Sequence, residues 1–433
     1  MYIKKVDINN VRSIREFEME FRELAGWHVL IGDNGAGKSS IIRSISLGLI
    51  GLEGAFALRE SWSNWLSFGQ EQGNINLFID RDMDYDVRTG FEGDRVHSHV
   101  GFRKREEDHI ALFFRTNNNY FNSDDDNFGS DRYLMDLDGW FSVAFGPYRR
   151  FAGGNPDKAK IFQEKNKLGA HLSAFGEDVA LVEATEWLVK LYFQSLEDQA
   201  NGRAESAELI ECFKKLINSP DFLPHGAKLD SISSSGVKFR DGYGNLIDIQ
   251  QMSDGYRSIL SLTFELIRQM IITYGADEVF REIEKGNIII DLPGVVLVDE
   301  IDAHLHPTWQ TRIGQWFTKY FPKIQFIVTT HSPLVCRAAT KGSIWRLTSP
   351  GSDLHSGEVT GLEKDRLVLG NVLDAYGTEI FGTGVSIAKE ADDKLNRLAE
   401  LNIKSMMGKL GDSELDELQH LKAIFPTERP GHP

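Results

Sequence analysis

A loop near the N-terminus has the residue types and spacing that bind phosphate. Residues 32–39 read Gly-Asp-Asn-Gly-Ala-Gly-Lys-Ser and fit the pattern G-x-x-x-x-G-K-[ST] in full. Glycines let backbone N–H groups turn toward an anion, and the start of a following helix adds partial positive charge. Lys38 would reach the β- and γ-phosphates of a nucleotide, and the Ser39 hydroxyl would bind Mg²⁺. The residues predicted to bind the nucleotide in this loop are Asn34, Gly35, Ala36, Gly37, Lys38, Ser39 and Ser40.

Two acidic residues at the end of a later apolar stretch would complete such a site. Residues 295–298 are apolar and are followed by Asp299 and Glu300. A buried strand can deliver a carboxylate to the sheet edge at which nucleotides bind. Asp299 would hold Mg²⁺, directly or through water, and Glu300 would orient and deprotonate the attacking water. Taken alone, the same pair could end an ordinary strand at the protein surface.

The next mostly apolar run, residues 324–328, is followed by Thr329, Thr330 and His331. His331 would hydrogen-bond the γ-phosphate of the nucleotide and respond to its presence. A lone histidine after a strand is more often a locally satisfied polar group. The order of strand and two acids, then strand and histidine, favours the functional interpretation.

The spacing of apolar residues predicts the elements that would carry these side chains. Residues 27–31 would form a short strand before the loop, and a helix would follow from about residue 39 to residue 49. The runs at 294–298 and 324–328 are typical of buried parallel strands. The other expected elements are two strands joined around 11–13, several strands in 70–145, helices in 158–217, a hairpin at 236–249, a helix at 256–272 and a helical tail at 385–424.

In this order, the segments resemble the ABC-type ATPase heads of the SMC, RecF and Rad50 class. They resemble most the smaller ATPases of bacterial anti-phage defence, which are related to the overcoming-lysogenization-defect family and to the ATPase subunit of Septu systems. Residues 32–39 match the family's Walker A loop, Asp299 and Glu300 its Walker B acids, and His331 its switch histidine. The resemblance implies an α/β fold: a P-loop ABC-type ATPase head with an antiparallel β subdomain, a short helical insert and a helical C-terminal tail. It also implies ATP and Mg²⁺ as cofactors.

Residues 252–258, Met-Ser-Asp-Gly-Tyr-Arg-Ser, stand where the family carries its signature motif. Ser253 and Gly255 precede a helix, so they can form a second anion site at its positive end. By resemblance this site binds the γ-phosphate held by the Walker A loop of another subunit, which implies a head-to-tail homodimer or higher oligomer. Asp254 and Tyr256 depart from the commonest residues of the motif. Ser253 and Asp254 would equally serve as an ordinary helix cap.

Two further positions of the family pattern are less clear. Residues 301–307 occupy the place of the D-loop, and they include His304 and His306. A zinc site is not predicted there, because no cysteine or further histidine lies at suitable spacing. The family's Q-loop glutamine is not evident, and Gly-Pro-Tyr-Arg-Arg stands in its place at residues 146–150. Whether Arg149 or Arg150 serves phosphate, nucleic acid or an interdomain contact is open at this point.

The spacing of the motifs predicts four segments. Residues 1–150 would form a first ATPase lobe with the Walker A loop and the β subdomain, and 151–235 a helical insert. Residues 236–345 would form a second lobe with the signature, Walker B strand and switch histidine, and 346–433 a helical tail. The insert shows no sustained heptad pattern, which excludes the long coiled-coil arms of Rad50 and SMC. In the tail, Leu395, Leu398, Leu401 and Ile403 lie near helical spacing, a pattern more often of core than of a docking face. The hypothesis that the tail makes partner or self contacts is kept beside it.

The composition limits the kinds of molecule that this chain could bind. The 433 residues include 48 basic and 64 acidic side chains, a formal net charge of −16, which repels nucleic-acid phosphates. The compact basic runs are at 103–105 and 149–150. Two cysteines far apart predict neither a disulfide framework nor a zinc site, and no apolar run reaches the ~20 residues of a membrane helix. The N-terminus lacks the pattern of a signal peptide, so we expect a cytoplasmic protein without membrane contact.

The sequence therefore predicts a Mg²⁺-dependent ATPase, converting ATP to ADP and phosphate, that senses a trigger or gates a separately encoded nuclease or toxin. No nuclease motif is found in this chain, so an effector would lie on another chain. The alternative is a RecF-like DNA-binding ATPase of repair or recombination, and nucleic acid is left open as a ligand. A scaffold with an inactive ATPase is disfavoured, because every required catalytic residue type is present.

Overall fold

The computed structural model describes most of the chain. The described residues are 1–58, 61–86, 94–105, 110–116, 140–149, 166–176, 183–348, 355–370, 389–407 and 411–424. The chain divides by its internal contacts into two units, Met1–Gly370 and Asn371–Pro433. Among the described residues, no helix combines the length and apolar character needed to cross a membrane. The predicted cytoplasmic location remains a prediction.

A six-stranded sheet lies at the centre of the first unit, with the order β14-β13-β3-β12-β11-β7. Five of its strands run parallel, and β14 is antiparallel to β13 at the edge. Every residue of β11 and β12 is buried, as expected for strands covered on both faces. The strands are β3 (Gly26–Gly32), β7 (Ser142–Phe145), β11 (Gly294–Val298), β12 (Ile324–Thr330), β13 (Ile344–Leu347) and β14 (Gly357–Val359). The predicted buried parallel strands are confirmed.

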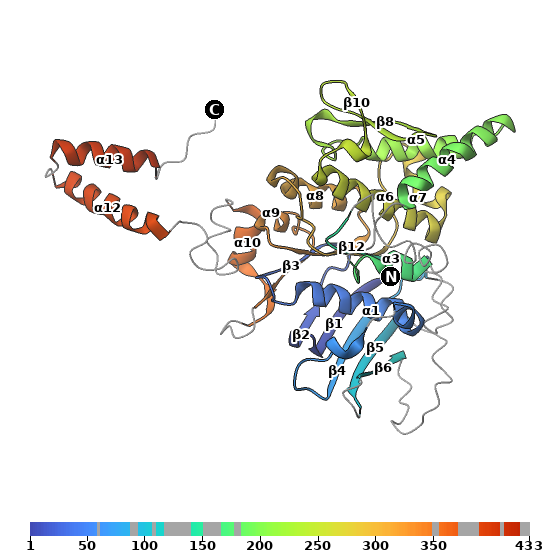
Figure 1. Cartoon of the computed structure of the whole chain (residues 1–433), viewed down its shortest axis with the longest axis horizontal. Helices are drawn as coiled ribbons and strands as arrows, with labels where there is room; N and C mark the ends of the chain where they lie inside the picture. Colours follow the sequence, from blue (N-terminus) through green and yellow to red (C-terminus); the bar gives the residue numbers. More distant parts are fainter. Residues whose placement is uncertain are drawn as a thin grey trace. The chain divides into compact units, whose positions relative to one another are not determined.

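A second, five-stranded sheet is antiparallel, with the order β2-β1-β4-β5-β6. Its strands alternate buried apolar and outward polar residues, the pattern of a sheet with one covered face. Helix α1 (Lys38–Ala57) contacts this sheet and also strands of the parallel sheet (Figure 1). The strands are β1 (Tyr2–Val11), β2 (Ile14–Glu20), β4 (Gln72–Asp80), β5 (Arg95–Lys104) and β6 (Ile110–Thr116). The predicted α/β class with an antiparallel β subdomain is confirmed.

Helices and a small third sheet complete the first unit. Helix α6 (Asp254–Tyr274) follows the three-stranded sheet β10-β9-β8, and α4 contacts both α6 and this sheet (Figure 1). The strands are β8 (Lys228–Ser233), β9 (Gly236–Arg240) and β10 (Leu246–Asp248). The other helices are α3 (Asn166–Leu172), α4 (Glu183–Ala200), α5 (Glu205–Ile217), α7 (Ala276–Glu284), α8 (Pro307–Tyr320), α9 (Pro333–Cys336) and α10 (Gly361–Leu369), with 3-10 turns at Trp62–Asn64, Pro224–Gly226 and Ile249–Gln251.

The second unit contains two helices, α12 (Lys389–Met406) and α13 (Asp412–Ile424). They share a small core of Leu398, Leu401, Leu418 and Leu421. The parallel sheet continues past residue 345, because β13 and β14 pair into it. The predicted division into four segments remains a prediction.

Candidate active site

The phosphate loop connects β3 to α1 and depends on two glycines. Gly35 and Gly37 have φ of 81° and 98°, a backbone region that L-residues rarely adopt. A Cβ on Gly37 would also lie 3.0 Å from the Ser13 hydroxyl oxygen. Gly37 is the N-cap of α1 and has no side chain to cap the helix. The first N–H groups of α1 are therefore open to an anion.

Lys38 lies inside this loop and is 6% exposed. Its ammonium donates to the carbonyl oxygens of Gly32 at 2.7 Å and Asp33 at 2.9 Å. Burial lowers the pKa of Lys38, and the carboxylates of Asp299 and Glu300 are the strongest charges that oppose this shift. The loop and the end of β11 thus lie within electrostatic reach of each other, because β3, β12 and β11 are neighbours in the sheet.

Thr329, a fully buried residue of β12, contacts both acidic residues at the end of β11. Its hydroxyl donates to the Asp299 carboxylate at 2.5 Å, and the backbone N–H of Glu300 donates to the same hydroxyl oxygen at 2.7 Å. Glu300 has a φ of 47°, so its backbone is in the left-handed region. Sequence reasoning did not assign this role to Thr329. A polar residue that ends a buried apolar strand beside an acidic one was the available signal.

The surroundings of Asp299 fit a magnesium ion. The residue is 3% exposed, and Thr329 engages one of its carboxylate oxygens. Among the described residues, no salt bridge occupies the other oxygen. Lys38 and Arg149 lie within electrostatic reach of this carboxylate, and carboxylate and hydroxyl oxygens are ligands that Mg²⁺ prefers. Asp299 and Ser39 at the loop have this donor chemistry.

The segment after Glu300 bends back toward β12. The backbone N–H of Ile301 donates to the Thr329 carbonyl at 3.0 Å, and that of His331 reaches the Asp302 carboxylate at 3.4 Å. His331 itself is half-buried at the carboxyl end of β12. His306 caps α8, because its imidazole Nδ1 accepts the backbone N–H of Thr308 at 3.3 Å. The cap therefore gives His306 a structural role.

The predicted signature segment begins α6. Ser253 is the exposed N-cap residue, and within the described chain its hydroxyl makes no capping hydrogen bond. Asp254 forms an ion pair with Arg257 in the first turn, which offsets its negative charge there. Gly255 is buried, and a Cβ there would lie 2.7 Å from the His304 carbonyl oxygen. The start of α6 thus packs against residues 301–306 of the same chain, and only glycine permits this approach.

Arg149, whose role the sequence left open, is 5% exposed and lies beside the acidic residues. Its Nη1 donates to the carbonyl oxygens of Gly146 at 2.9 Å and Asp299 at 2.7 Å. Its Nη2 donates to the Glu300 carbonyl at 2.8 Å, and its Nε to the Ser258 hydroxyl at 3.2 Å. Burial lowers the pKa of Arg149 to about 10, so the guanidinium stays charged at neutral pH. Arg149 therefore makes internal contacts; Arg150 lies outside the described residues.

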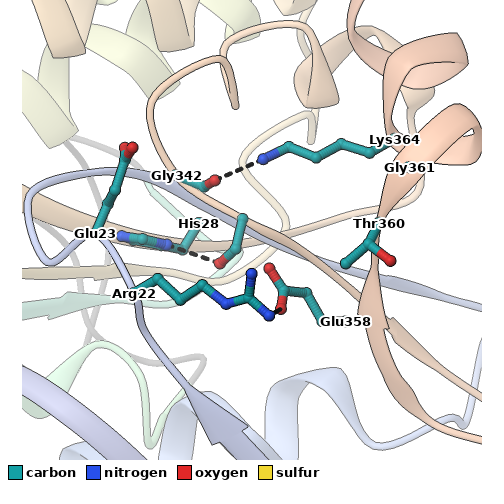
Figure 2. A pocket seen from close by; sticks show the side chains of 9 residues that line it. Arg22, Glu23, His28, Gly342, Glu358, Thr360, Gly361 and Lys364 are labelled. Atoms are coloured by element: carbon teal, nitrogen blue, oxygen red, sulfur yellow. Dashed lines mark hydrogen bonds and ion pairs between the residues drawn. The ribbon is translucent and has the colours of Figure 1, made fainter.

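A separate cavity of about 260 Å³ lies at the opposite, amino end of β3 (Figure 2). His28 is buried in its wall between the Ser343 hydroxyl and the Leu24 carbonyl, and burial lowers its pKa to about 4. Arg22 pairs with Glu358 at 3.9 Å across the cavity. None of the predicted site residues lines it. The cavity is thus distinct from the loop and acidic residues at the carboxyl end of the sheet.

Comparisons with known proteins agree with the motifs. The family model described as "AAA domain, putative AbiEii toxin, Type IV TA system" matches residues 28–337. The chain is 27% identical to "Septu protein PtuA" of Bacillus mycoides (strain KBAB4), over 79% of this chain and 40% of the relative. It is 23% identical to "Septu protein PtuA" of Bacillus thuringiensis, over 78% of this chain and 74% of the relative. The predicted resemblance to Septu ATPases is confirmed.

A retron protein and solved structures add to the comparison. The chain is 30% identical to "Retron Ec83 probable ATPase" of Escherichia coli, over 35% of this chain and 28% of the relative. The chain thus spans less than half of the length of this relative and of the B. mycoides protein. An SMC head bound to the C-winged helix domain of ScpA aligns at a TM-score of 0.48 and 19% identity, covering 84% of this chain and 99% of that one. RecF with ATP aligns at a TM-score of 0.40 and 14% identity, covering 83% of this chain and 99% of that one.

Proposed function

Because the chain belongs to the AAA-domain family whose model matches residues 28–337, we propose that it binds ATP at the loop 32–39 and hydrolyses it with Mg²⁺. The observation that carries the proposal is that Lys38, Asp299 and Glu300 follow the carboxyl ends of β3 and β11, the two parallel neighbours of β12. Lys38 and the open N–H groups of α1 bind the phosphates, and Ser39 and Asp299 hold the metal. Bound Mg²⁺ supplies positive charge that stabilises the reacting phosphate.

Glu300 and His331 act at the γ-phosphate in this proposal. Glu300 orients the attacking water and accepts its proton, and His331 hydrogen-bonds the γ-phosphate. The backbone of Glu300 is held by Thr329 and Arg149, so the peptide that carries the carboxylate is fixed. This is what a general base requires.

Glu300→Gln is the direct test of this function. The amide keeps the size of the side chain but cannot accept a proton, so we expect ATP binding to persist while kcat falls by roughly 100-fold or more. Phosphate release measured with and without Mg²⁺ reports hydrolysis, and a fluorescent ATP analogue reports binding. Lys38→Ala is the matched loss-of-binding control. Normal turnover by Glu300→Gln would remove Glu300 as the base, and retained affinity in Lys38→Ala would refute the loop assignment.

Two copies would share the nucleotide in a head-to-tail homodimer or higher oligomer. The support is the exposed Ser253 hydroxyl at the positive end of α6, with Gly255 beside it. In this arrangement Ser253 and Gly255 complete the ATP site of the other copy. The native mass of Glu300→Gln with and without ATP would show whether ATP drives association.

We further propose that the ATPase acts in anti-phage defence and gates a separately encoded nuclease or toxin after sensing a trigger. The similarity to proteins named for Septu and retron systems supports the defence role. The net charge of −16 favours a basic protein partner over broad coating of DNA. Co-purification of a nuclease encoded beside this chain would support the proposal.

A RecF-like DNA-binding ATPase is the competing function. Arg149 is unavailable to DNA because it is buried and bonded to backbone carbonyls. The other basic run, Arg103, Lys104 and Arg105, is exposed near the end of β5 and would be the DNA contact in this alternative. Hydrolysis stimulated by duplex DNA in a salt-dependent way, and lost on charge reversal at these three positions, would favour it.

A further inference from the structure

We propose that Arg149 is a positioning residue that couples the start of α6 to the general base Glu300. The inference rests on the proposed ATPase function and adds a link between its two half-sites. In this view, contact of another copy's nucleotide with the Ser253 end of α6 is transmitted through Ser258 and Arg149 to the backbone of Glu300.

The first support is the way in which one guanidinium joins three elements. Arg149 follows β7 and donates to Gly146 in its own turn, to Asp299 and Glu300 after β11, and to Ser258 on α6. The four distances lie between 2.7 and 3.2 Å, and Arg149 is almost completely buried. The guanidinium is planar and rigid, so its nitrogens cannot move independently. A displacement of Ser258 therefore changes the bonds to Asp299 and Glu300.

The second support is the backbone conformation of Glu300. A φ of 47° is unfavourable for a residue with a Cβ and persists only where the surroundings impose it. Here the N–H of Glu300 is held by Thr329, and its carbonyl accepts from Arg149 at 2.8 Å and from the backbone N–H of Ala303 at 2.9 Å. If the bond from Arg149 is lost, the carbonyl keeps only the bond from Ala303, which lies in the same turn and does not tie it to β7 or α6. The direction of the Glu300 carboxylate then becomes less defined.

The third support is the position of Ser258 on α6. It is buried and lies in the first turns of the helix, after Ser253 and Gly255. Gly255 packs under the His304 carbonyl, so the start of α6 also contacts the segment that continues from Glu300. A helix moves as a rigid element over such a short distance, so a shift at Ser253 reaches Ser258.

The test compares two buried serines on the same helix. Ser258→Ala removes the bond to Arg149, whereas Ser261→Ala removes a hydroxyl that donates to the Ser258 carbonyl within α6. Both side chains are buried, so the two changes carry a similar packing cost. We expect Ser258→Ala to lower kcat by about 10-fold with KM for ATP within about two-fold of wild type, and Ser261→Ala to leave both unchanged.

Together with Ser258→Ala, the variants Arg149→Lys and Arg149→Lys/Ser258→Ala form a double-mutant cycle. Lysine keeps the charge but cannot bridge four acceptors, so we expect kcat to fall by roughly 10- to 100-fold while ATP binding persists. The double variant should be no slower than Arg149→Lys, because Ser258 acts through Arg149. Thermal unfolding of each variant shows how much chain is folded, and rates are compared per folded chain.

Several outcomes would overturn the inference. Equal kcat in Ser258→Ala and Ser261→Ala would remove the link to α6. Additive losses in the double variant would show that the two residues act independently. If the lower kcat of Arg149→Lys is fully explained by its smaller folded fraction, Arg149 has a structural role only. Each of these results would overturn the inference while the wild-type chain still hydrolyses ATP, so the proposed function would stand. A wild-type chain without Mg²⁺-dependent hydrolysis would refute the proposed function and this inference together.

Discussion

A single hydroxyl, that of Thr329, serves both acidic residues after β11. It donates to the carboxylate of Asp299 and accepts the N–H of Glu300. Because Thr329 is fully buried, water cannot replace these bonds when the hydroxyl is removed. The magnesium ligand and the general base of the proposed site are thus positioned by the neighbouring strand.

Thr329→Val should impair hydrolysis more than it impairs folding. Valine has nearly the same shape, but leaves a buried carboxylate oxygen and an N–H unsatisfied, which costs about 1–3 kcal/mol of unfolding free energy. We expect kcat to fall by about 10- to 100-fold, because both acidic residues lose their fixed positions. Denaturant unfolding and phosphate release measure the two effects.

Two further variants distinguish a specific effect on the site from a general effect on β12. Thr330→Val is the matched control, because Thr330 is equally buried in β12 and its hydroxyl accepts the N–H of Ser332 instead. Thr329→Ser should restore most of the activity. Equal losses of kcat in the two valine variants would contradict a specific role for Thr329.

The residues of the site were predictable from sequence to different degrees. The loop 32–39 and the acids Asp299 and Glu300 carry motifs in which residue type and spacing are set by local chemistry. Arg149 has no such local signature, since its burial is created by Gly146, Ser258 and β11 together. Contacts that join distant parts of the chain in this way depend on the tertiary fold, which the spacing of residues in sequence does not reveal.

At the scale of elements, apolar runs predicted the strands that are buried on both faces, and the prediction was less complete for strands with polar residues. β11 and β12 read as apolar runs because both faces are covered. β5 lies within 70–145, where several strands were expected, but no run was assigned to it, because His97, Ser98 and His99 interrupt its apolar residues. β8 and β13 were also missed, because short strands depend on partners that are distant in sequence.

The packing of α6 on residues 301–306 leads to a prediction for Gly255→Ala. A Cβ at this position would lie 2.7 Å from a backbone carbonyl oxygen, so either the helix or the segment must move. We expect ATP binding to stay within about two-fold of wild type and both ATP-dependent association and kcat to fall by about 10-fold. Analytical ultracentrifugation with ATP and a phosphate-release assay measure these changes.

Gly357→Ala is the matched control for this prediction. Gly357 begins β14, and among the described residues no heavy atom lies within 4 Å of a Cβ built there. The control should therefore associate and hydrolyse ATP as wild type does. If Gly255→Ala also behaves as wild type, the close approach is not needed for the function of α6.

For the whole molecule, the two units have separate cores. The core of the first unit joins residues of the antiparallel sheet, α1 and the parallel sheet. The second unit has a core of four leucines between α12 and α13, with ion pairs from Arg397 to Glu417 and from Lys404 to Glu414. Leu398 and Leu401 thus pack inside the tail, whereas Ile403 is exposed. Met406 and Met407 are exposed beside it.

A chain that stops after Gly370 should keep the ATPase and lose its partner. All the site residues precede this point, so we expect kcat within about two-fold of wild type and, in the Glu300→Gln background, unchanged ATP-dependent association. Ile403, Met406 and Met407 are exposed at the end of α12, and exposed apolar side chains with flexible methionines are typical of protein-binding sites. Pull-down of a nuclease encoded beside this chain should therefore fail with the truncated protein. Met406→Glu in the full chain should weaken the same capture without changing hydrolysis, whereas undiminished capture by both variants would place the partner surface in the first unit.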